Sequence, residues 1–195
     1  MGTMQTTFPR VRRVSRDEYY QMADLGMFRD QRVELIAGKI IRMPAQRDPH
    51  AISVSITHDA LKAVFGAGYW VRSQLPLSLL KRSEPEPDAS VVLGQARDYL
   101  GKGHPTNALL VVEVSDTTLS FDRRYKAGLY ARAGIADYWI VNVEDRQLEV
   151  LRNPVADPSK RFGYGYADVS ILRDGQTVSP LSMPTAVIRV ADLLP

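Results

Sequence analysis

The sequence contains no cysteine among its 195 residues. Disulfide bridges, thiolate metal sites and a cysteine nucleophile are therefore all excluded. Histidine is also scarce, and His50, His58 and His104 lack the i, i+4 spacing of a helical metal pair. Nothing in the sequence therefore indicates a zinc site.

Long apolar runs are absent as well. No stretch approaches the ~20 apolar residues that a membrane span requires. The N-terminal segment MGTMQTTFPRVRR lacks the apolar core of a secretory signal. We therefore expect a cytoplasmic protein without a membrane partner. The net charge of only +3 permits nucleic-acid binding without arguing for it, because dedicated binders usually carry a sharper basic patch.

The composition suits one soluble domain, since 45% of the residues are hydrophobic and 24% are charged. We expect a flexible basic arm over residues 1–13 and a single domain over residues 14–195. Ser15 and Glu18 form a capping-box pattern, which predicts a first helix from about Arg16 to Leu25.

Hydrophobic periodicity and turn residues predict the remaining elements. They are a hairpin at 33–43, a helix at 50–65, strands at 69–73, 75–80, 88–93 and 148–151, a loop at 153–160, a half-exposed strand at 163–171, and short strands before a terminal turn at 190–194. The core contacts expected of the helix at 50–65 are Ile52, Ile56, Leu61, Val64 and Phe65.

The stretch from Leu109 to Val143 organises the chain. Its first residues, LLVVEV, are typical of a strand buried on both faces, with Glu113 near the carboxyl end. A polar loop, a helix over about Ser120–Ala133 and a strand over Asp137–Val143 follow. Such strand–helix–strand units carry their chemistry at the carboxyl ends of strands. A buried Glu113 must be paired or must coordinate a metal.

Three acidic residues interrupt apolar surroundings: Glu34 in VELI, Asp88 in PDASVV, and Glu113. Carboxylates that face one point suit Mg²⁺, which takes oxygen ligands and keeps several waters. A bound metal lowers the pKa of its water and offsets the charge that develops during phosphodiester hydrolysis. Glu34 is the weaker candidate ligand, since it could instead form an ion pair at the edge of the hairpin.

Lys126 is the fourth candidate. Asp122, Lys126, Leu129 and Ala133 follow one another at spacings of four, three and four residues, so they share one helical face. Because Leu129 and Ala133 should pack on the sheet, the Lys126 side chain could approach Glu113 across the short loop. Its ammonium group could then orient the attacking water or stabilise the transition state.

Each of these residues also has a structural interpretation. Asp88 after a proline could be a turn or capping residue, and Lys126 could form an exposed i, i+4 pair with Asp122. Glu113 could pair with Arg123 or Arg124. We expect no functional role for several other residues. Tyr138 and Trp139 should lie in the core, His50 at a helix start and His58 on a helix surface, and Arg10, Arg12 and Arg13 should belong to a solvated arm.

Several strings in this order resemble one family. They are Glu34-Leu35-Ile36-Ala37-Gly38-Lys39-Ile40-Ile41, Pro87-Asp88, Val112-Glu113-Val114-Ser115, Asp122 with Lys126, and Tyr130, Gly134, Ile135, Tyr138 and Trp139. This set is similar to the Uma-type family of predicted restriction endonucleases, within the PD-(D/E)xK nuclease superfamily. The resemblance covers about Ser15 to Leu151.

The resemblance implies a restriction-endonuclease-like α/β fold, a mixed sheet flanked by helices. It also implies a divalent metal on Asp88 and Glu113, with Lys126 as the catalytic lysine. The superfamily motif places a lysine two residues after the second acid, where this chain has Ser115. In the resembled family the next helix usually supplies this lysine, which Lys126 could do here. Asn142 stands where relatives often have Asp.

The predicted function is that of an endonuclease dependent on Mg²⁺ or Mn²⁺ that acts on nucleic acid, with DNA as the expected substrate and a homodimer as the expected assembly. One alternative is an inactive nucleic-acid- or protein-binding module on the same fold, which would bind DNA with a steep salt dependence. Another is a metal-dependent hydrolase of a small phosphoester.

Overall fold

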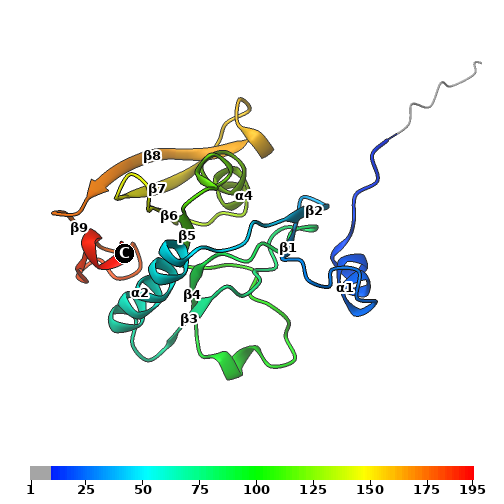
Figure 1. The fold of residues 1–195 in the computed structure, drawn as a ribbon, viewed down its shortest axis with the longest axis horizontal. Helices are drawn as coiled ribbons and strands as arrows, with labels where there is room; N and C mark the ends of the chain where they lie inside the picture. Colours follow the sequence, from blue (N-terminus) through cyan, green and yellow to red (C-terminus); the bar gives the residue numbers. More distant parts are fainter. Residues whose placement is uncertain (1–9) are drawn as a thin grey trace, which may run out of the picture.

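The computed structural model describes residues 10–195, which are built around a six-stranded mixed sheet (Figure 1). The strand order is β3-β4-β5-β6-β7-β8. The strands are β3 (Tyr69–Ser73), β4 (Ala89–Leu93), β5 (Leu110–Ser115), β6 (Asp137–Asn142), β7 (Gln147–Ala156) and β8 (Tyr164–Arg173). Only β5 and β6 pair in parallel, and the other neighbours are antiparallel.

The helices and two small hairpins surround this sheet. They are α1 (Arg16–Asp24), α2 (Asp48–Val64), α3 (Leu119–Phe121), the π-helical turn η2 (Asp122–Lys126), α4 (Ala127–Arg132), the 3-10 turns η1 (Ala96–Tyr99), η3 (Arg161–Gly163) and η4 (Val190–Leu193), and the pairs β1 (Val33–Ile36) with β2 (Lys39–Arg42) and β9 (Thr177–Val178) with β10 (Ile188–Arg189). The mixed sheet flanked by helices is the architecture that the sequence predicts. No helix within residues 10–195 is both long and apolar enough to cross a bilayer.

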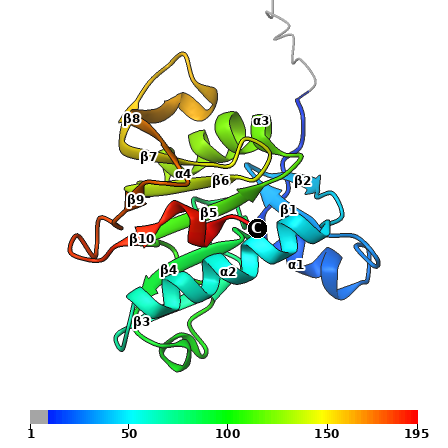
Figure 2. The ribbon, with the colours of Figure 1, turned by 60° about the vertical axis from the view of Figure 1, so that its left-hand side comes forward.

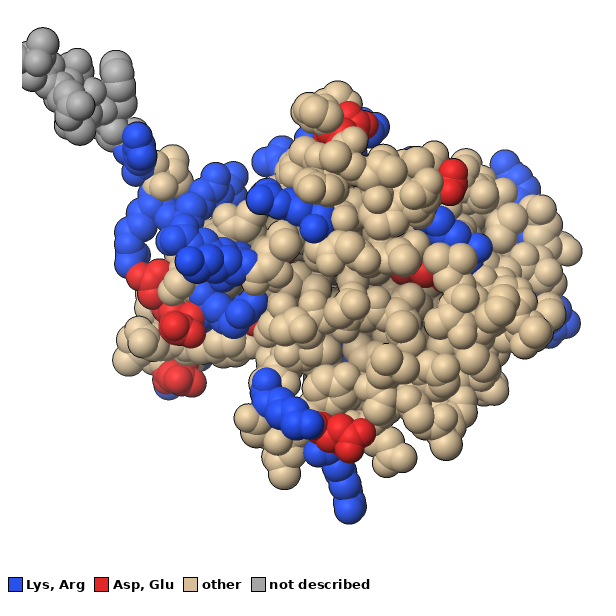
Figure 3. All heavy atoms as spheres, turned by 180° about the vertical axis from the view of Figure 1, so that it is seen from behind, with Lys and Arg blue, Asp and Glu red and all other residues tan. Residues whose placement is uncertain are grey.

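The predicted N-terminal arm is described only in part, because residues 1–9 lie outside the described residues. Arg12 forms an ion pair with Glu18, and Arg13 donates a hydrogen bond to the carbonyl oxygen of Ala37 at 3.3 Å. The capping box between Ser15 and Glu18 is present as predicted. Lys and Arg gather on the side of the molecule that carries α1 and the β1–β2 hairpin (Figure 3).

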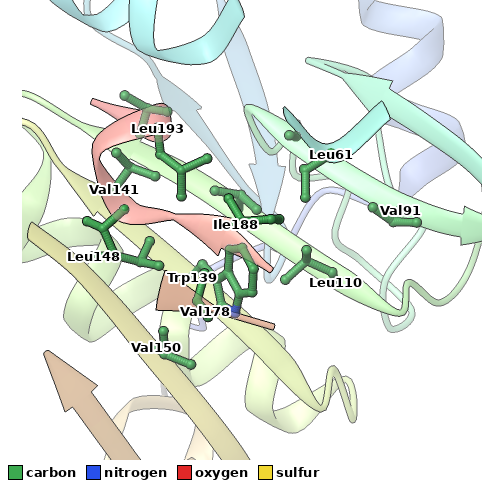
Figure 4. Packing of buried hydrophobic residues seen from close by; sticks show 14 of the residues in the cluster. Leu61, Val91, Leu110, Trp139, Val141, Leu148, Val150, Val178, Ile188 and Leu193 are labelled. Atoms are coloured by element: carbon green, nitrogen blue, oxygen red, sulfur yellow. The ribbon is translucent and has the colours of Figure 1, made fainter. Parts of the chain in front are cut away.

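The core lies on both faces of the sheet. On one face Leu61 of α2 and Leu193 of η4 pack over Trp139, and α2 lies beside the C-terminal segment in two views (Figures 1, 2 and 4). On the other face Tyr130 of α4 packs with Tyr138. Tyr138 and Trp139 are fully buried, which confirms that they are core residues. Successive strand residues point to opposite faces, which separates these two neighbours.

Three predictions about local structure are wrong. Residues 75–80 form no strand, because the amides of Leu77 and Ser78 donate to the carbonyl oxygens of Pro85 and Pro105 instead of a ladder. The alternating apolar pattern there reflects burial, since Leu77 and Leu79 are fully buried.

The prediction for the buried face of α2 is wrong only for its first turns, because Leu61 and Phe65 are buried and Val64 packs against the core as expected. Ile52 is 51% exposed, whereas Ser53 and Thr57 are buried and Leu61 is buried as expected. The Ser53 hydroxyl donates to the carbonyl oxygen of Leu193 at 2.7 Å, so a polar residue turns inward to meet the C-terminal segment.

The predicted loop at 153–160 begins later than expected, because β7 continues to Ala156. Pro154 lies in this extension and pairs with Tyr166 of β8. A proline is tolerated there because β6 begins at Asp137, opposite Arg152, so β6 does not pair with β7 beyond Arg152.

Candidate active site

Four sequence-predicted residues, Glu34, Asp88, Glu113 and Lys126, line one pocket beside the carboxyl end of β5. They come from β1, the start of β4, β5 itself and η2. All four are buried, with at most 6% of any of them exposed. The fold thus brings together residues that are up to 92 positions apart in the chain.

The sheet register places Asp88 next to Glu113. Ala89 of β4 pairs with Val112 of β5, so Asp88, one step earlier, stands opposite Glu113. Side chains opposite each other on an antiparallel pair share a face, with their Cβ atoms about 5 Å apart. Val112 and Val114 point to the face covered by α2, and Glu113 therefore points to the face covered by α4.

Lys126 connects two of the carboxylates. Its Nζ donates to Glu113 Oε1 at 2.9 Å and to Glu34 Oε1 at 3.0 Å. Lys126 and Asp122 are both buried, so the alternative of an exposed i, i+4 pair is wrong. The predicted helix is present, but its Asp122–Lys126 turn is π-helical, a feature that is common at functional sites and that the periodicity did not indicate.

Glu34 is more deeply placed than the sequence suggested. It is 2% exposed, and its ion pair is with the buried Lys126 rather than at the exposed edge of the hairpin. Its second oxygen, Oε2, is buried without a hydrogen-bond partner among the described residues. A buried carboxylate oxygen without a partner is costly, and it is available to a cation in the pocket.

Sequence reasoning missed Tyr130, which was recognised only as part of a family motif. Its hydroxyl donates to Glu113 Oε1 at 2.6 Å. The proposed pairing of Glu113 with Arg123 is wrong, because Arg123 forms two hydrogen bonds with Glu149 instead, at 2.8 and 2.6 Å. Arg124 lies in no ion pair among residues 10–195.

Sequence reasoning also missed His50, to which it gave only a place at a helix start. His50 Nε2 lies 3.2 Å from Asp88 Oδ1, and Gln74 donates to the same oxygen at 3.1 Å. The backbone N–H of Val114 donates to Asp88 Oδ2 at 2.8 Å. The Asp48-Pro49 helix start fixes His50 in the first turn of α2, but only the packing of α2 turns it toward Asp88.

The pocket is lined by more carboxyl groups than cationic side chains. Burial raises the pKa of Glu113 well above its usual range, although the Lys126 ammonium opposes this, and burial likewise raises the pKa of Glu34. Burial raises the pKa of Asp122 to about 6. Burial would lower the pKa of Lys126, but Glu113 and Glu34 outweigh it, so the pKa is raised and the ammonium stays protonated.

Asp88 differs from the other carboxyl groups. Burial acts to raise its pKa, but the hydrogen bond and charge of His50, with the Val114 N–H, outweigh burial and lower it. Asp88 is therefore held as a carboxylate. Four buried carboxyl groups, Glu34, Asp88, Glu113 and Asp122, line the pocket with the single buried ammonium of Lys126.

These residues fit a divalent cation by their chemistry. No group of three His, Cys, Asp or Glu side chains within residues 10–195 is gathered tightly enough to form a metal site by itself. Mg²⁺, however, requires only one or two protein carboxylates and completes its shell with water and phosphate oxygens. Adjacent Asp88 and Glu113 supply two carboxylates, and the unpartnered Oε2 of Glu34 lies in the same pocket.

A search of the curated proteins gave no match. A crystal structure described as "a putative nuclease belonging to DUF820", from Anabaena variabilis ATCC 29413, superposes with a TM-score of 0.66 at 15% identity, covering 92% of this chain and 97% of that chain. This likeness confirms the predicted fold. The family model Uma2, described as "Putative restriction endonuclease", matches residues 16–191. Because that match spans most of the chain, the protein belongs to the Uma2 family.

Proposed function

We propose that this protein is a metal-dependent endonuclease that hydrolyses phosphodiester bonds in DNA. The observation that carries the proposal is the position of Lys126, whose ammonium lies between Glu113 and Glu34 beside the adjacent Asp88. A lysine next to two carboxylates at strand ends is the arrangement expected of the catalytic centre. Family membership supports the same reaction class.

Asp88 and Glu113 would hold Mg²⁺ or Mn²⁺, with Glu34 as an outer ligand. When bound, the ion lowers the pKa of a coordinated water and offsets charge on the phosphate. Lys126 remains protonated, so it can donate hydrogen bonds to the attacking water or to a phosphate oxygen. Tyr130 fixes the orientation of the Glu113 carboxylate, while His50 and Gln74 fix that of Asp88.

The distribution of charge supports a polyanionic substrate. Residues 10–47 carry nine basic and five acidic side chains, whereas the whole chain carries 25 and 22. The excess of basic over acidic side chains therefore lies on the side of the molecule that carries α1 and the β1–β2 hairpin (Figure 3). Exposed Arg32 and Arg47 from this part of the chain line the mouth of the acidic pocket. Cations near the pocket favour nucleic acid by neutralising phosphates and releasing counterions.

A homodimer is part of the proposal, because two copies would present one site to each strand of a duplex. Sedimentation velocity of the protein alone and with a short duplex tests this assembly. If the protein stays monomeric in both conditions, the homodimer is refuted, and the proposed activity reduces to nicking of one strand.

Nicking of supercoiled plasmid tests the proposed function. Wild-type protein with Mg²⁺ or Mn²⁺ should convert supercoiled plasmid to open-circular or linear forms, and chelation should abolish the reaction. Asp88→Asn and Lys126→Met should lose activity, while Lys62→Met, which removes an exposed lysine of α2, should retain it. Metal-independent nicking, or full activity in Asp88→Asn, would refute the proposal. Binding of DNA without any turnover would favour the inactive binding module.

A further inference from the structure

Two hollows continue from the acidic pocket across α3 and η2 toward η3. The first shares Thr117 and Thr118 with the acidic pocket, and it shares Arg124 and Arg161 with the second. Because the lining residues are shared, the three hollows form one path along the surface. We call the part beyond the acidic pocket the arginine groove, defined by Thr117, Thr118, Arg124, Lys160 and Arg161.

The charge of this path changes sign along its length. The acidic pocket is lined by carboxylates, whereas neither of the two following hollows has an Asp or Glu in its lining. Arg123 also lines the second hollow, but Glu149 neutralises it through two hydrogen bonds. Arg124 and Arg161 are exposed, and neither has a carboxylate within ion-pair distance in the part of the chain that the structure describes.

The position of Arg161 is fixed by its surroundings. Its guanidinium lies 4.2 Å from the centroid of the Tyr125 ring, a cation–π contact, and Tyr125 in turn stacks on Phe121 with centroids 5.0 Å apart. Phe162 meets the same Tyr125 ring edge-on at 5.1 Å. The aromatic rings are therefore already used to hold the arginine, which argues against stacking of a nucleobase on Tyr125.

The backbone beneath Arg161 is also unusual. Phe162 has a φ of +66°, a left-handed conformation that is costly for a bulky side chain. The carbonyl oxygen of Arg161 lies so close to α4 that a Cβ on Gly128 would come within 2.6 Å of it. The chain accepts backbone strain and a close approach here, and both place Arg161 beside the path from the acidic pocket.

We propose that Arg124 and Arg161 bind phosphates of the nucleic-acid strand that flank the phosphate held at the acidic pocket. This inference rests on the proposed nuclease function for the substrate's identity. A guanidinium presents paired N–H donors that match two oxygens of one phosphate, and it cannot lose its charge near neutral pH. Contacts to phosphates alone make this groove a positioning surface that is independent of base sequence.

Binding of a fluorescein-labelled DNA duplex in EDTA tests the inference without requiring cleavage. Fluorescence anisotropy at several salt concentrations gives the slope of log K against log salt, and the size of this slope falls by about 0.9 for each phosphate that the protein no longer neutralises. Arg124→Ala and Arg161→Ala should each weaken binding and reduce this slope, and the double variant should reduce it by about twice as much. The matched control is Arg97→Ala, which removes the same charge from exposed η1 next to β4.

The outcomes separate this inference from the proposed function. The proposed role of Arg124 and Arg161 would be refuted if the slope is unchanged in both single variants, or if it falls only as much as in Arg97→Ala. This holds even if the wild-type protein cleaves plasmid. No DNA binding by wild-type protein would overturn it too. Reduced slopes in a protein that never cleaves would keep the groove and refute the nuclease alone. Arg124 is exposed, so its variant should fold normally, and Arg161→Lys retains the charge while removing the paired donors.

Discussion

The ammonium of Lys126 should be a major determinant of folding stability, and Lys126→Met tests this. Lys126 is 1% exposed and donates to two buried carboxylates, at 2.9 Å to Glu113 and 3.0 Å to Glu34. Methionine preserves most of the volume but leaves both carboxylates without their cation. Removing one partner of a buried ion pair costs about 3–5 kcal/mol. We expect a loss of that size in the metal-free protein at pH 8.

The loss should depend on pH in a defined direction. Without the lysine, the pKa values of Glu113 and Glu34 rise further above the ordinary glutamate value of 4.5, because burial is no longer opposed. Stability linked to a raised carboxyl pKa is present below 4.5 and is lost as the pH rises toward the folded-state pKa. The cost of leaving these two buried carboxyl groups without their cation should therefore be larger at pH 8 than at pH 5.

Urea unfolding of both proteins at pH 5 and pH 8, in the presence of a chelator, gives the required free energies. Lys62→Met serves as the control, since exposed substitutions usually change stability by less than about 0.5 kcal/mol. The expected result is a difference between wild type and Lys126→Met that is clearly larger at pH 8 than at pH 5. An equal difference at the two pH values, or a loss below about 1 kcal/mol at pH 8, would refute the buried network.

Three further predictions concern the metal and the groove. His50→Ala should lower metal affinity by about 10–100-fold in titration calorimetry, because His50 orients Asp88; unchanged affinity would contradict that role. Because burial raises the pKa of Glu113, metal binding should release protons, and metal affinity should increase from pH 5.5 to pH 8. Calorimetry in buffers of different ionisation enthalpy measures this proton release. A metal affinity that does not vary with pH would contradict the prediction. Gly128→Ala should lower the free energy of unfolding by about 1–3 kcal/mol, because its Cβ would meet the Arg161 carbonyl at 2.6 Å; stabilisation, as helix propensity alone predicts, would show that η3 does not pack there.

Local patterns were sufficient for most of the secondary structure. The capping box at Ser15 formed because its partners are three residues apart. The apolar run before Glu113 is typical of a strand covered on both faces, and it forms β5 in the middle of the sheet. The errors occurred where long-range contacts override local patterns, as at Ile52, whose predicted place is taken by Ser53 because the C-terminal segment accepts its hydrogen bond.

The sequence by itself determined the identity of the chemical groups: Asp88 before a strand, Glu113 at the end of another, and a lysine one helical segment later. Only the tertiary structure decided how they meet. The antiparallel register sets Asp88 opposite Glu113, and the π-helical turn buries Lys126 between Glu113 and Glu34. The packing of α2 brings His50 to Asp88, which no local pattern could indicate. Periodicity reports which face of an element is apolar, whereas the neighbour that covers this face is set by contacts between residues far apart in the chain.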